Sequence, residues 1–332
     1  MLWNNDDANN LLTSVTIFNA KQNESNTDPV ALISTTHCMI AMAGNIVAKV
    51  PPKELCFEDK IAFLKVEYEF GRRLPGRHLV KFIGSVCLKS KILLREASES
   101  KEPVLIMDRL PKDSELMLMA QGKSLPQDAG VQLGKMLMIL HDTAPIVPLK
   151  EALKTWDFEK RDVDRYLDRL AILAARSNPN IAKYMYSLRN KMLLRIKSVF
   201  KILQKRAERG FYRDIHADPH MENVFFVRGA PSLIDPMPKK IRRRVDVLTD
   251  AARVGLELLR LGEQGHYLSF LQAYPLTHEE QEVFHFFMGR HMIADWWHFS
   301  PIDGIRYSRR FSFIFAVLDP FIFMPKTVIN DN

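Results

Sequence analysis

One stretch of the sequence holds the residue types that phosphoryl transfer needs. It covers residues 215–223, IHADPHMEN, and Asp235 follows twelve residues later. Asp218 offers a carboxylate that can orient an attacking hydroxyl and accept its proton, and Asn223 and Asp235 offer further oxygen ligands. Mg²⁺ prefers such oxygens, with one or two carboxylates beside the substrate phosphates. The spacing therefore predicts Asp218 and Asn223 as catalytic residues, and Asn223 and Asp235 as ligands of Mg²⁺.

Other interpretations of this stretch are weaker. His216 and His220 are four residues apart, as in helical zinc sites, but Pro219 interrupts the helix that such a site requires. We expect His216 to form a hydrogen bond within the loop instead. Asp214 has no Asn five residues later, so we interpret it as a structural residue that forms a salt bridge.

The sequence here resembles the kinase-like phosphotransferases. Residues 216–223, HADPHMEN, are similar to that superfamily's catalytic loop, and Ile234-Asp235 is similar to its metal-binding Asp. The superfamily includes aminoglycoside and choline kinases, lipopolysaccharide-core kinases and the UbiB-type atypical kinases, for which HADPH is the typical spelling. The resemblance implies a two-lobed protein-kinase-like fold that binds ATP and Mg²⁺ in the cleft between a β-rich N-lobe and a helical C-lobe.

Further motifs follow in the order that the resemblance requires. Residues 45–49, NIVAK, look like the strand whose Lys pairs with the nucleotide phosphates, which assigns that role to Lys49. Its partner is expected on the next helix, where Glu67 is favoured over Glu69; a solvated helix face is the alternative for both. Residues 104–110, VLIMDRL, resemble the strand that enters the adenine-binding hinge, so Asp108 and Leu110 are expected to contact the nucleotide. Residues 133–141, LGKMLMILH, are similar to a helix of aminoglycoside phosphotransferases.

The sequence also departs from the superfamily pattern. No glycine occurs in the strand–loop–strand at residues 33–37, so Ser34, Thr35 and Thr36 are expected to face the phosphates instead of a glycine-rich loop. Pro236 follows Asp235 where an aromatic residue is usual. The UbiB-type extension is absent as well. These departures leave two alternatives open: a UbiB-like kinase or ATPase, and a pseudokinase that binds or scaffolds without catalysis.

A basic run comes directly after Asp235. It consists of Lys239, Lys240, Arg242, Arg243 and Arg244. Arginine clusters suit phosphate and carboxylate groups, so this run favours an anionic acceptor; a solvated loop is the alternative. The stretch also resembles lipopolysaccharide-core kinases, which implies a small-molecule or glycan acceptor such as lipopolysaccharide core. A single short patch without interleaved aromatic residues does not indicate nucleic-acid binding.

The elements that must position these residues follow from hydrophobic periodicity. We expect three short strands over residues 30–50, a helix over 58–74 and two strands over 80–88 and 103–107. The remainder is mostly helical and is interrupted by a β-hairpin. We expect the helices at residues 130–141, 158–175, 180–208, 245–261, 267–273, 278–297 and 307–318, and the hairpin strands at 224–227 and 232–234. This pattern predicts an α+β protein.

Composition limits the class of protein. The chain has 332 residues, 47% hydrophobic residues, three cysteines and a net charge of +8, which excludes disordered and disulfide-rich classes. It shows no signal peptide or membrane-spanning run, so we expect a cytoplasmic protein, with peripheral membrane contact near Arg309 and Arg310 as an alternative. The predicted parts are a flexible arm at 1–26, an N-lobe at 27–107, a hinge at 108–111, and a C-lobe at 112–330 with its catalytic loop at 215–223.

Overall fold

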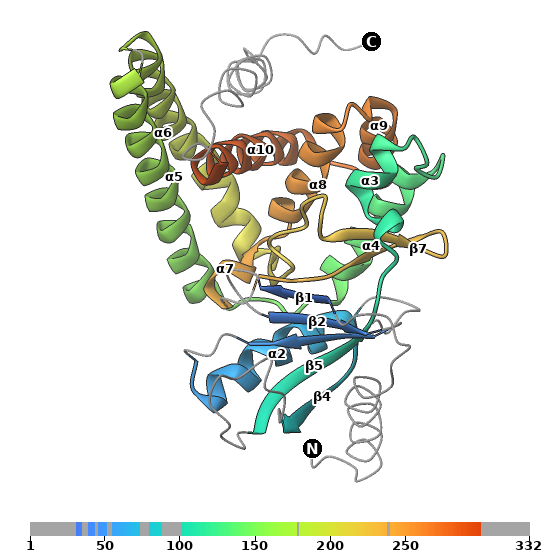
Figure 1. Ribbon diagram of the computed structural model, residues 1–332. Coiled ribbons are helices and arrows are strands. Elements are labelled where there is room, and N and C mark those ends of the chain that lie inside the picture. Colours follow the sequence, from blue (N-terminus) through green and yellow to red (C-terminus); the bar gives the residue numbers. More distant parts are fainter. Residues whose placement is uncertain are drawn as a thin grey trace. The chain divides into compact units, whose positions relative to one another are not determined.

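The computed structural model (Figure 1) describes residues 31–34, 39–43, 46–51, 55–73, 80–87, 101–177, 179–237 and 240–299. The predicted arm, Thr35, Thr36, Lys239 and the helix expected at 307–318 lie outside these ranges. Contacts divide the chain into two units. The N-terminal unit comprises Met1–Met119 with Asn223–Pro238, and the C-terminal unit comprises Ala120–Glu222 with Lys239–Asn332.

In its described residues, the N-terminal unit contains an antiparallel five-stranded sheet and one long helix. The strands are β1 (Ala31–Ser34), β2 (Met39–Ala43), β3 (Ile46–Val50), β4 (Val80–Cys87) and β5 (Lys101–Asp108), in the spatial order β1-β2-β3-β5-β4. Helix α2 (Phe57–Gly71) stands between β3 and β4 in the sequence. The predicted strand–helix–strand order is therefore confirmed.

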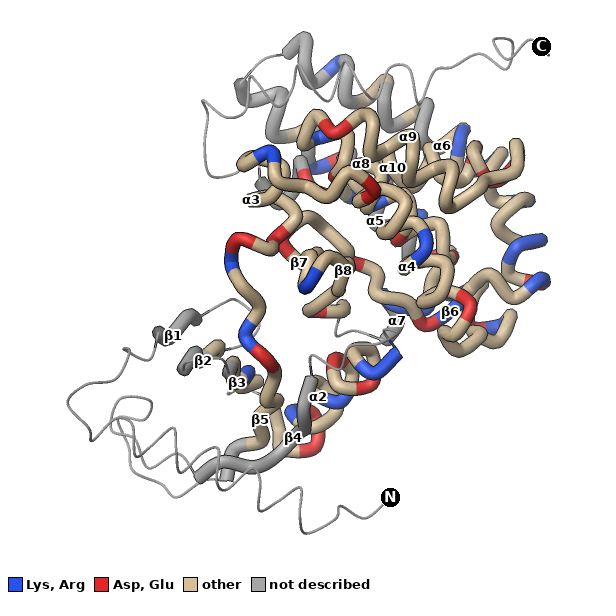
Figure 2. The backbone as a smooth tube through the Cα atoms, turned by 90° about the vertical axis from the view of Figure 1, so that its right-hand side faces the viewer, with Lys and Arg blue, Asp and Glu red and all other residues tan. Residues whose placement is uncertain are grey.

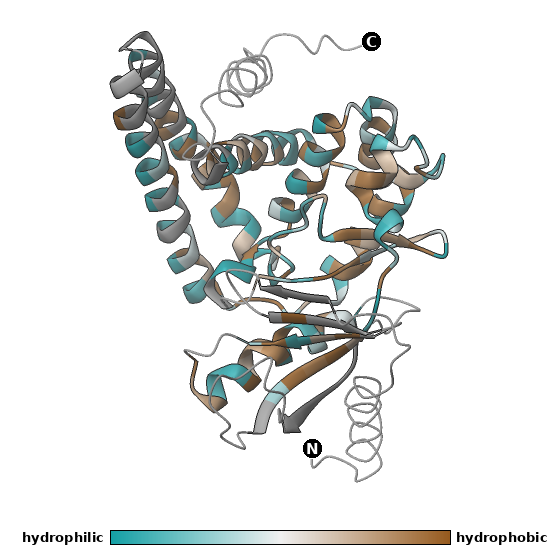
Figure 3. Ribbon diagram, viewed as in Figure 1, coloured by the Kyte–Doolittle hydropathy of each residue, from teal (hydrophilic) through white to brown (hydrophobic). Residues whose placement is uncertain are grey.

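The core of this unit lies between α2 and the sheet. Leu64 of α2 and Leu105 of β5 are fully buried and pack with Met107. Hydrophobic residues dominate the middle of β5 (Figure 3), and its residues Val104–Met107 are all buried, as expected for a strand with a neighbour on each side. This packing fixes β3 beside α2, the two elements that carry Lys49 and Glu67.

A β-hairpin from later in the chain completes the N-terminal unit. Strands β7 (Val224–Val227) and β8 (Ala230–Leu233) pair through a two-residue turn, Arg228-Gly229, in which both residues have positive φ. Such turns match the natural twist of a hairpin. Phe225 also bridges to Glu115, just after the short 3₁₀ helix η1 (Lys112–Ser114). The hairpin therefore holds Asn223 at its start and Asp235 after its end.

The C-terminal unit is mostly helical. Helix α3 (Leu116–Gln121) crosses the boundary between the two units, and α5 and α6 form a long hairpin (Figure 1). The helices wholly within the unit are α4 (Ala129–Thr143), α5 (Leu149–Ser177), α6 (Pro179–Glu208), α7 (Lys240–Arg243), α8 (Leu248–Arg260), α9 (Gln264–Ala273) and α10 (His278–Phe299). Nearly all of α8 is buried, so it forms the centre of the unit.

One expected helix begins later than predicted. Residues Arg244–Asp246 form strand β9, which pairs with β6 (Tyr212–Asp214), and helix α8 begins only at Leu248. The pairing buries Val245 and Asp246, a gain that local periodicity does not reveal.

Among the described residues, no helix combines the length and apolar character that spanning a bilayer requires.

Candidate functional site

Three of the predicted residues meet in the N-terminal unit. The Lys49 Nζ donates a hydrogen bond to Glu67 Oε2 at 2.7 Å and another to the carboxylate of Asp235. Lys49 and Glu67 are 3% and 6% exposed. Glu69, the alternative on the same helix, is exposed and pairs with Lys65. Charged residues of both signs occur along α2 (Figure 2), but only Glu67 of the two candidates reaches Lys49.

The Lys49 ammonium stays charged although it is buried. Burial alone lowers the pKa of a lysine, but the carboxylates of Glu67 and Asp235 outweigh this effect and hold the pKa of Lys49 above its usual range. The Phe63 ring lies 5.7 Å from Nζ and supplies a further favourable contact for a cation. The result is a fixed positive charge that can bind an anionic group.

Asp235 has an unusual backbone conformation. Its φ of +61° lies in the left-handed region that non-glycine residues rarely adopt. Its N–H donates to Glu67 Oε1 at 3.2 Å, so Glu67 holds both the Lys49 side chain and the Asp235 backbone. The Asp235 side chain is 52% exposed and remains accessible to a ligand. Pro236 is buried and does not displace the carboxylate from Lys49.

Asn223 lies in the same unit as Asp235. It is buried, and its carbonyl oxygen accepts the N–H of Ile234 at 3.1 Å, which ties the residue before β7 to the residue after β8. One amide oxygen and one carboxylate are the kind of partial ligand set that Mg²⁺ accepts when phosphates and water supply the remainder. Among the described residues, no group of three or more His, Cys, Asp and Glu side chains could hold a metal by itself. The residues present fit a metal that arrives with phosphates.

Two of the other predicted nucleotide contacts are ordered on the sheet. Asp108 is the last residue of β5 and pairs with Ile46 of β3, and Leu110 follows it, half-buried, in the segment before η1. Ser34 is the last residue of β1, opposite Met39 of β2. Strand pairing fixes where these residues lie in the chain but does not show what they bind. The nucleotide-binding roles of Asp108, Leu110 and Ser34 therefore stay predictions, as do those of Thr35 and Thr36.

The predicted catalytic loop, except for Asn223, lies in the C-terminal unit, where Asp250 of α8 braces it. The backbone N–H groups of His216 and Ala217 donate to the two oxygens of the Asp250 carboxylate, at 3.1 and 2.7 Å. Ala217 has φ +65°, a conformation that this brace holds. The Asp218 N–H donates to His216 Nδ1 at 3.2 Å, so the predicted hydrogen bond of His216 within the loop is confirmed. The Asp218 side chain is 37% exposed, with His220 Nε2 3.9 Å away.

Sequence reasoning missed the residues behind this loop. Asp250 is 1% exposed, and His141 of α4 places Nε2 3.6 Å from Asp250 Oδ2. His141 ends the helix motif at 133–141, and Asp250 stands six residues after the basic run. No spacing rule links either residue to the loop, because the contact forms only when α4 and α8 pack.

Two residues of the basic run, Arg243 and Arg244, form ion pairs with carboxylates of the protein itself. Arg243 Nε donates to Asp214 Oδ1 at 2.8 Å, which confirms Asp214 as a salt-bridging residue. Arg244 pairs with Glu151 of α5. Lys240 opens α7, Arg242 lies within it, and Lys239 is outside the described residues. The ion pairs give Arg243 and Arg244 a structural role, and acceptor binding by the run stays a prediction.

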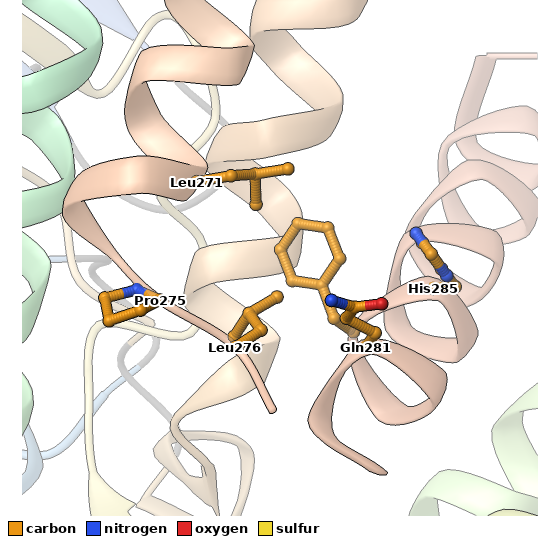
Figure 4. Close-up of a pocket in the computed structure, with 6 residues that line it drawn as sticks. Leu271, Pro275, Leu276, Gln281 and His285 are labelled. Carbon is orange, nitrogen blue, oxygen red and sulfur yellow. The ribbon is translucent and has the colours of Figure 1, made fainter. Parts of the chain in front are cut away.

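A cavity of about 360 Å³ lies elsewhere in the C-terminal unit, at the connection of α9 and α10 (Figure 4). Its lining consists of Leu271, Pro275, Leu276, Gln281, Phe284 and His285. Burial, with a smaller contribution from Arg195, lowers the pKa of His285 to about 4, so this side chain is neutral at pH 7. The lining has no charged group that could hold phosphates, and we assign no phosphoryl chemistry to it.

Comparison with known proteins shows the fold. Neither a protein-family model nor a curated protein sequence matches the chain. A solved complex of APH(2″)-IIIa with GDP and kanamycin is similar in structure, with a TM-score of 0.51 and 13% identity over 92% of this chain and 98% of that one. Spectinomycin phosphotransferase APH(9)-Ia, in complex with ADP and spectinomycin, has a TM-score of 0.50 and 12% identity over 89% and 91%.

A choline/ethanolamine kinase family protein from Mesorhizobium loti is similar at the same level, with a TM-score of 0.50 and 12% identity over 90% of this chain and 92% of that one. These neighbours are small-molecule phosphotransferases of the protein-kinase-like superfamily. The chain therefore has the two-lobed α+β fold of that superfamily, as its sequence predicts.

Proposed function

We propose that this protein is a nucleotide-dependent phosphotransferase that moves the γ-phosphoryl group of ATP to a hydroxyl of a small molecule. The observation that carries the proposal is the buried Lys49, held between Glu67 and Asp235 in a protein-kinase-like fold. The removal of these charges from water costs free energy, and clusters of buried charged groups with one accessible member are found preferentially at functional sites. Kinases use such a set for the phosphates and metal of ATP.

The roles in nucleotide binding follow from the chemistry of each group. Lys49 would neutralise the α- and β-phosphates, with Glu67 holding its ammonium in place. Asp108 and Leu110 would contact the base through the backbone, and Ser34, Thr35 and Thr36 would face the phosphates. Asn223 and Asp235 would hold Mg²⁺, which when bound neutralises charge on the phosphate oxygens.

The transfer step assigns the proton to Asp218. The acceptor oxygen forms a bond to the γ-phosphorus while the bond from that phosphorus to the β-phosphate oxygen breaks, and the hydroxyl proton passes to the Asp218 carboxylate. Asp250 supports this step because it fixes the backbone of the two residues before Asp218. Catalysis then rests on positioning and electrostatics.

The acceptor is proposed at the level of a small molecule. Two structural neighbours were solved with kanamycin and spectinomycin, and both proteins cover nearly the whole of this chain. The finer proposal, an anionic glycan such as lipopolysaccharide core, rests on the basic run, and the proposed membrane contact rests on Arg309 and Arg310, which lie outside the described residues. Arg243 and Arg244 already have carboxylate partners, so binding of such an acceptor by these two residues would compete with their ion pairs.

The test compares three carboxylate variants of the full chain. Asp218→Ala should lower transfer from labelled ATP or GTP to pooled sugars, aminoglycosides and lipid-linked glycans roughly 100- to 10,000-fold, with nucleotide affinity unchanged. Asp235→Ala should weaken Mg²⁺-dependent nucleotide binding itself. Glu222→Ala, which removes an exposed carboxylate from the same loop, is the matched control and should stay active. Full turnover by Asp218→Ala, or nucleotide binding without transfer to any acceptor, would contradict the proposal, and the latter would favour a pseudokinase.

A further inference from the structure

Behind the catalytic loop, a chain of buried polar groups leads from α9 to Asp250. The Tyr274 hydroxyl, just after α9, lies 2.9 Å from His141 Nδ1, and the other ring nitrogen of His141 faces Asp250. Tyr274, His141 and Asp250 are 8%, 4% and 1% exposed, so water has little access to this contact. We propose that Tyr274 is a positioning residue for the catalytic loop, because it determines which nitrogen of His141 carries the proton that faces Asp250.

The hydroxyl of Tyr274 must donate this hydrogen bond. Burial is the main effect that raises the pKa of Tyr274. The nearby carboxylates of Asp246, Asp250 and Glu280 raise this pKa further, and Arg206 lowers it by less, so the phenol keeps its proton. The hydroxyl has no other hydrogen-bond partner among the described residues. If it accepted a hydrogen bond from Nδ1, its own hydrogen would be buried without a partner, which is unfavourable. Donation to Nδ1 avoids this cost.

That donation places the imidazole proton on Nε2. A neutral imidazole has one donor and one acceptor nitrogen, so an Nδ1 that accepts leaves Nε2 as the N–H. Nε2 lies 3.6 Å from Asp250 Oδ2, which is too long for a hydrogen bond but close enough for the N–H to attract the carboxylate. The opposite tautomer would turn a lone pair toward that carboxylate and repel it.

The repelled carboxylate is the one that braces the loop. Asp250 Oδ2 also accepts the His216 N–H at 3.1 Å, and Oδ1 accepts the Ala217 N–H at 2.7 Å. A shift of Asp250 would therefore loosen the left-handed conformation of Ala217, the residue directly before Asp218. Displacement of a reacting group by about 1 Å can cost up to 100-fold in rate.

The contact between Tyr274 and His141 depends on small residues where α4 packs against α9. A Cβ added to Gly130 would lie 2.0 Å from the backbone oxygen of His266, and one added to Gly134 would lie 2.9 Å from the Ala273 Cβ. Both glycines share a face of α4 with His141, seven residues after Gly134. The two helices approach so closely here that the Tyr274 hydroxyl reaches His141 directly, and the Tyr274 ring stacks on Phe270.

The kinetic part of the test rests on the proposed function. Tyr274→Phe removes the hydroxyl and keeps the ring, and we expect kcat to fall about tenfold while the KM for ATP stays constant. Tyr267→Phe is the matched control, since Tyr267 is a buried tyrosine within α9, seven residues before Tyr274, and its hydroxyl has no hydrogen bond among the described residues. An equal loss in Tyr267→Phe, or no loss in Tyr274→Phe, would overturn the inference.

A second background separates positioning from packing. His141→Gln keeps an N–H₂ donor near the place of Nε2 but has no tautomers, so Tyr274→Phe should cause no further loss of kcat in this variant. An equal tenfold loss in both backgrounds would show that Tyr274 acts only through packing. This double-mutant comparison requires no assumption about the acceptor.

A third measurement does not depend on activity. Nitrogen chemical shifts of the His141 ring should show the proton on Nε2 in the wild-type protein and a mixture of tautomers in Tyr274→Phe, with signals assigned through His141→Gln. A wild-type proton on Nδ1, or no change in Tyr274→Phe, would overturn the inference even if transfer is observed. If transfer fails for every acceptor but the shifts behave as stated, the proposed function fails and the positioning role of Tyr274 stands.

Discussion

Lys49 carries a positive charge at a place where water cannot stabilise it. The charged form of Lys49 is stabilised by the carboxylate of Glu67, which is also buried, and by that of Asp235, which is half-exposed. We expect Lys49→Met to lower the free energy of unfolding by about 3–5 kcal/mol, because the Glu67 carboxylate would be left buried without a cation. Urea unfolding of the full chain followed by fluorescence, with the transition checked for intermediates, measures the change.

The control for Lys49→Met removes both charges. Lys49→Met combined with Glu67→Met replaces the pair with apolar groups and should recover most of the lost stability, although nucleotide binding stays lost. Lys65→Met, which breaks the exposed pair with Glu69, should cost less than about 1 kcal/mol. A double variant no more stable than Lys49→Met would show that the cost comes from lost packing.

The residues that could be predicted from the sequence stand at recognisable positions along the chain. Asp218, Asn223 and Asp235 stand at a spacing that phosphoryl transfer explains, and Lys49 and Glu67 stand where the resemblance to the kinase-like phosphotransferases places them. Asp250, His141 and Tyr274 have no such spacing, because their contacts depend on how α4, α8 and α9 pack. The same limit applies to Arg243: its type suggested an anion partner, but only the structure shows that Asp214 supplies the anion.

At the scale of elements, helix α10 begins with a capping box. Thr277 Oγ1 lies 3.3 Å from the N–H of Glu280, and the Glu280 carboxylate accepts the Thr277 N–H at 3.0 Å. Removal of such a cap costs about 1 kcal/mol, so Thr277→Ala should lower the stability by this amount, measured by urea unfolding at pH 7. Thr277→Ser keeps the hydroxyl and should restore nearly all of it.

This cap also predicts a dependence on pH. Burial alone would raise the pKa of Glu280, but hydrogen bonds from Thr277 and the nearby Arg206 outweigh it and lower the pKa below its ordinary value. The stabilisation is therefore present above the unfolded pKa of about 4.3 and is lost as the pH falls through the lower folded pKa. The stability difference between wild type and Thr277→Ala should shrink below about pH 4; a constant difference down to pH 3 would contradict it.

Local periodicity predicted most elements but misplaced the start of α8. The apolar positions of 245–261 have helical spacing, yet Val245 and Asp246 belong to β9. These residues form a strand because they pair with β6, more than thirty residues earlier in the chain. Arg206 also binds Asp246 with hydrogen bonds of 2.7 and 3.1 Å. Helix α8 then begins where the Leu248 N–H donates to Asp246. A strand that depends on distant partners leaves no periodic signal of its own.

At the scale of the whole molecule, the chain leaves the N-terminal unit and later returns to it. Residues 223–238 pack with the first 119 residues, although 103 residues of the C-terminal unit lie between them. Val224, Phe226 and Leu233 are buried, and Asp235 binds Lys49. The exposure of Val224, Phe226 or Leu233 to water costs about 1.5–3 kcal/mol each. The segment that carries Asn223 and Asp235 should therefore unfold locally only together with β3 and β5.

Amide hydrogen exchange of two core variants tests this assignment. Leu105→Ala removes a fully buried side chain of the N-terminal unit, and Phe287→Ala removes one of the C-terminal unit; each should cost several kcal/mol, about 2–5. Leu105→Ala should speed exchange in β3, β5 and the peptide 223–238, while α8 and α10 keep most of their protection. Phe287→Ala should do the reverse. If the peptide 223–238 follows α8 and α10 instead, Asn223 and Asp235 belong energetically with the predicted catalytic loop, and the Lys49 cluster would form only after the C-terminal unit has folded.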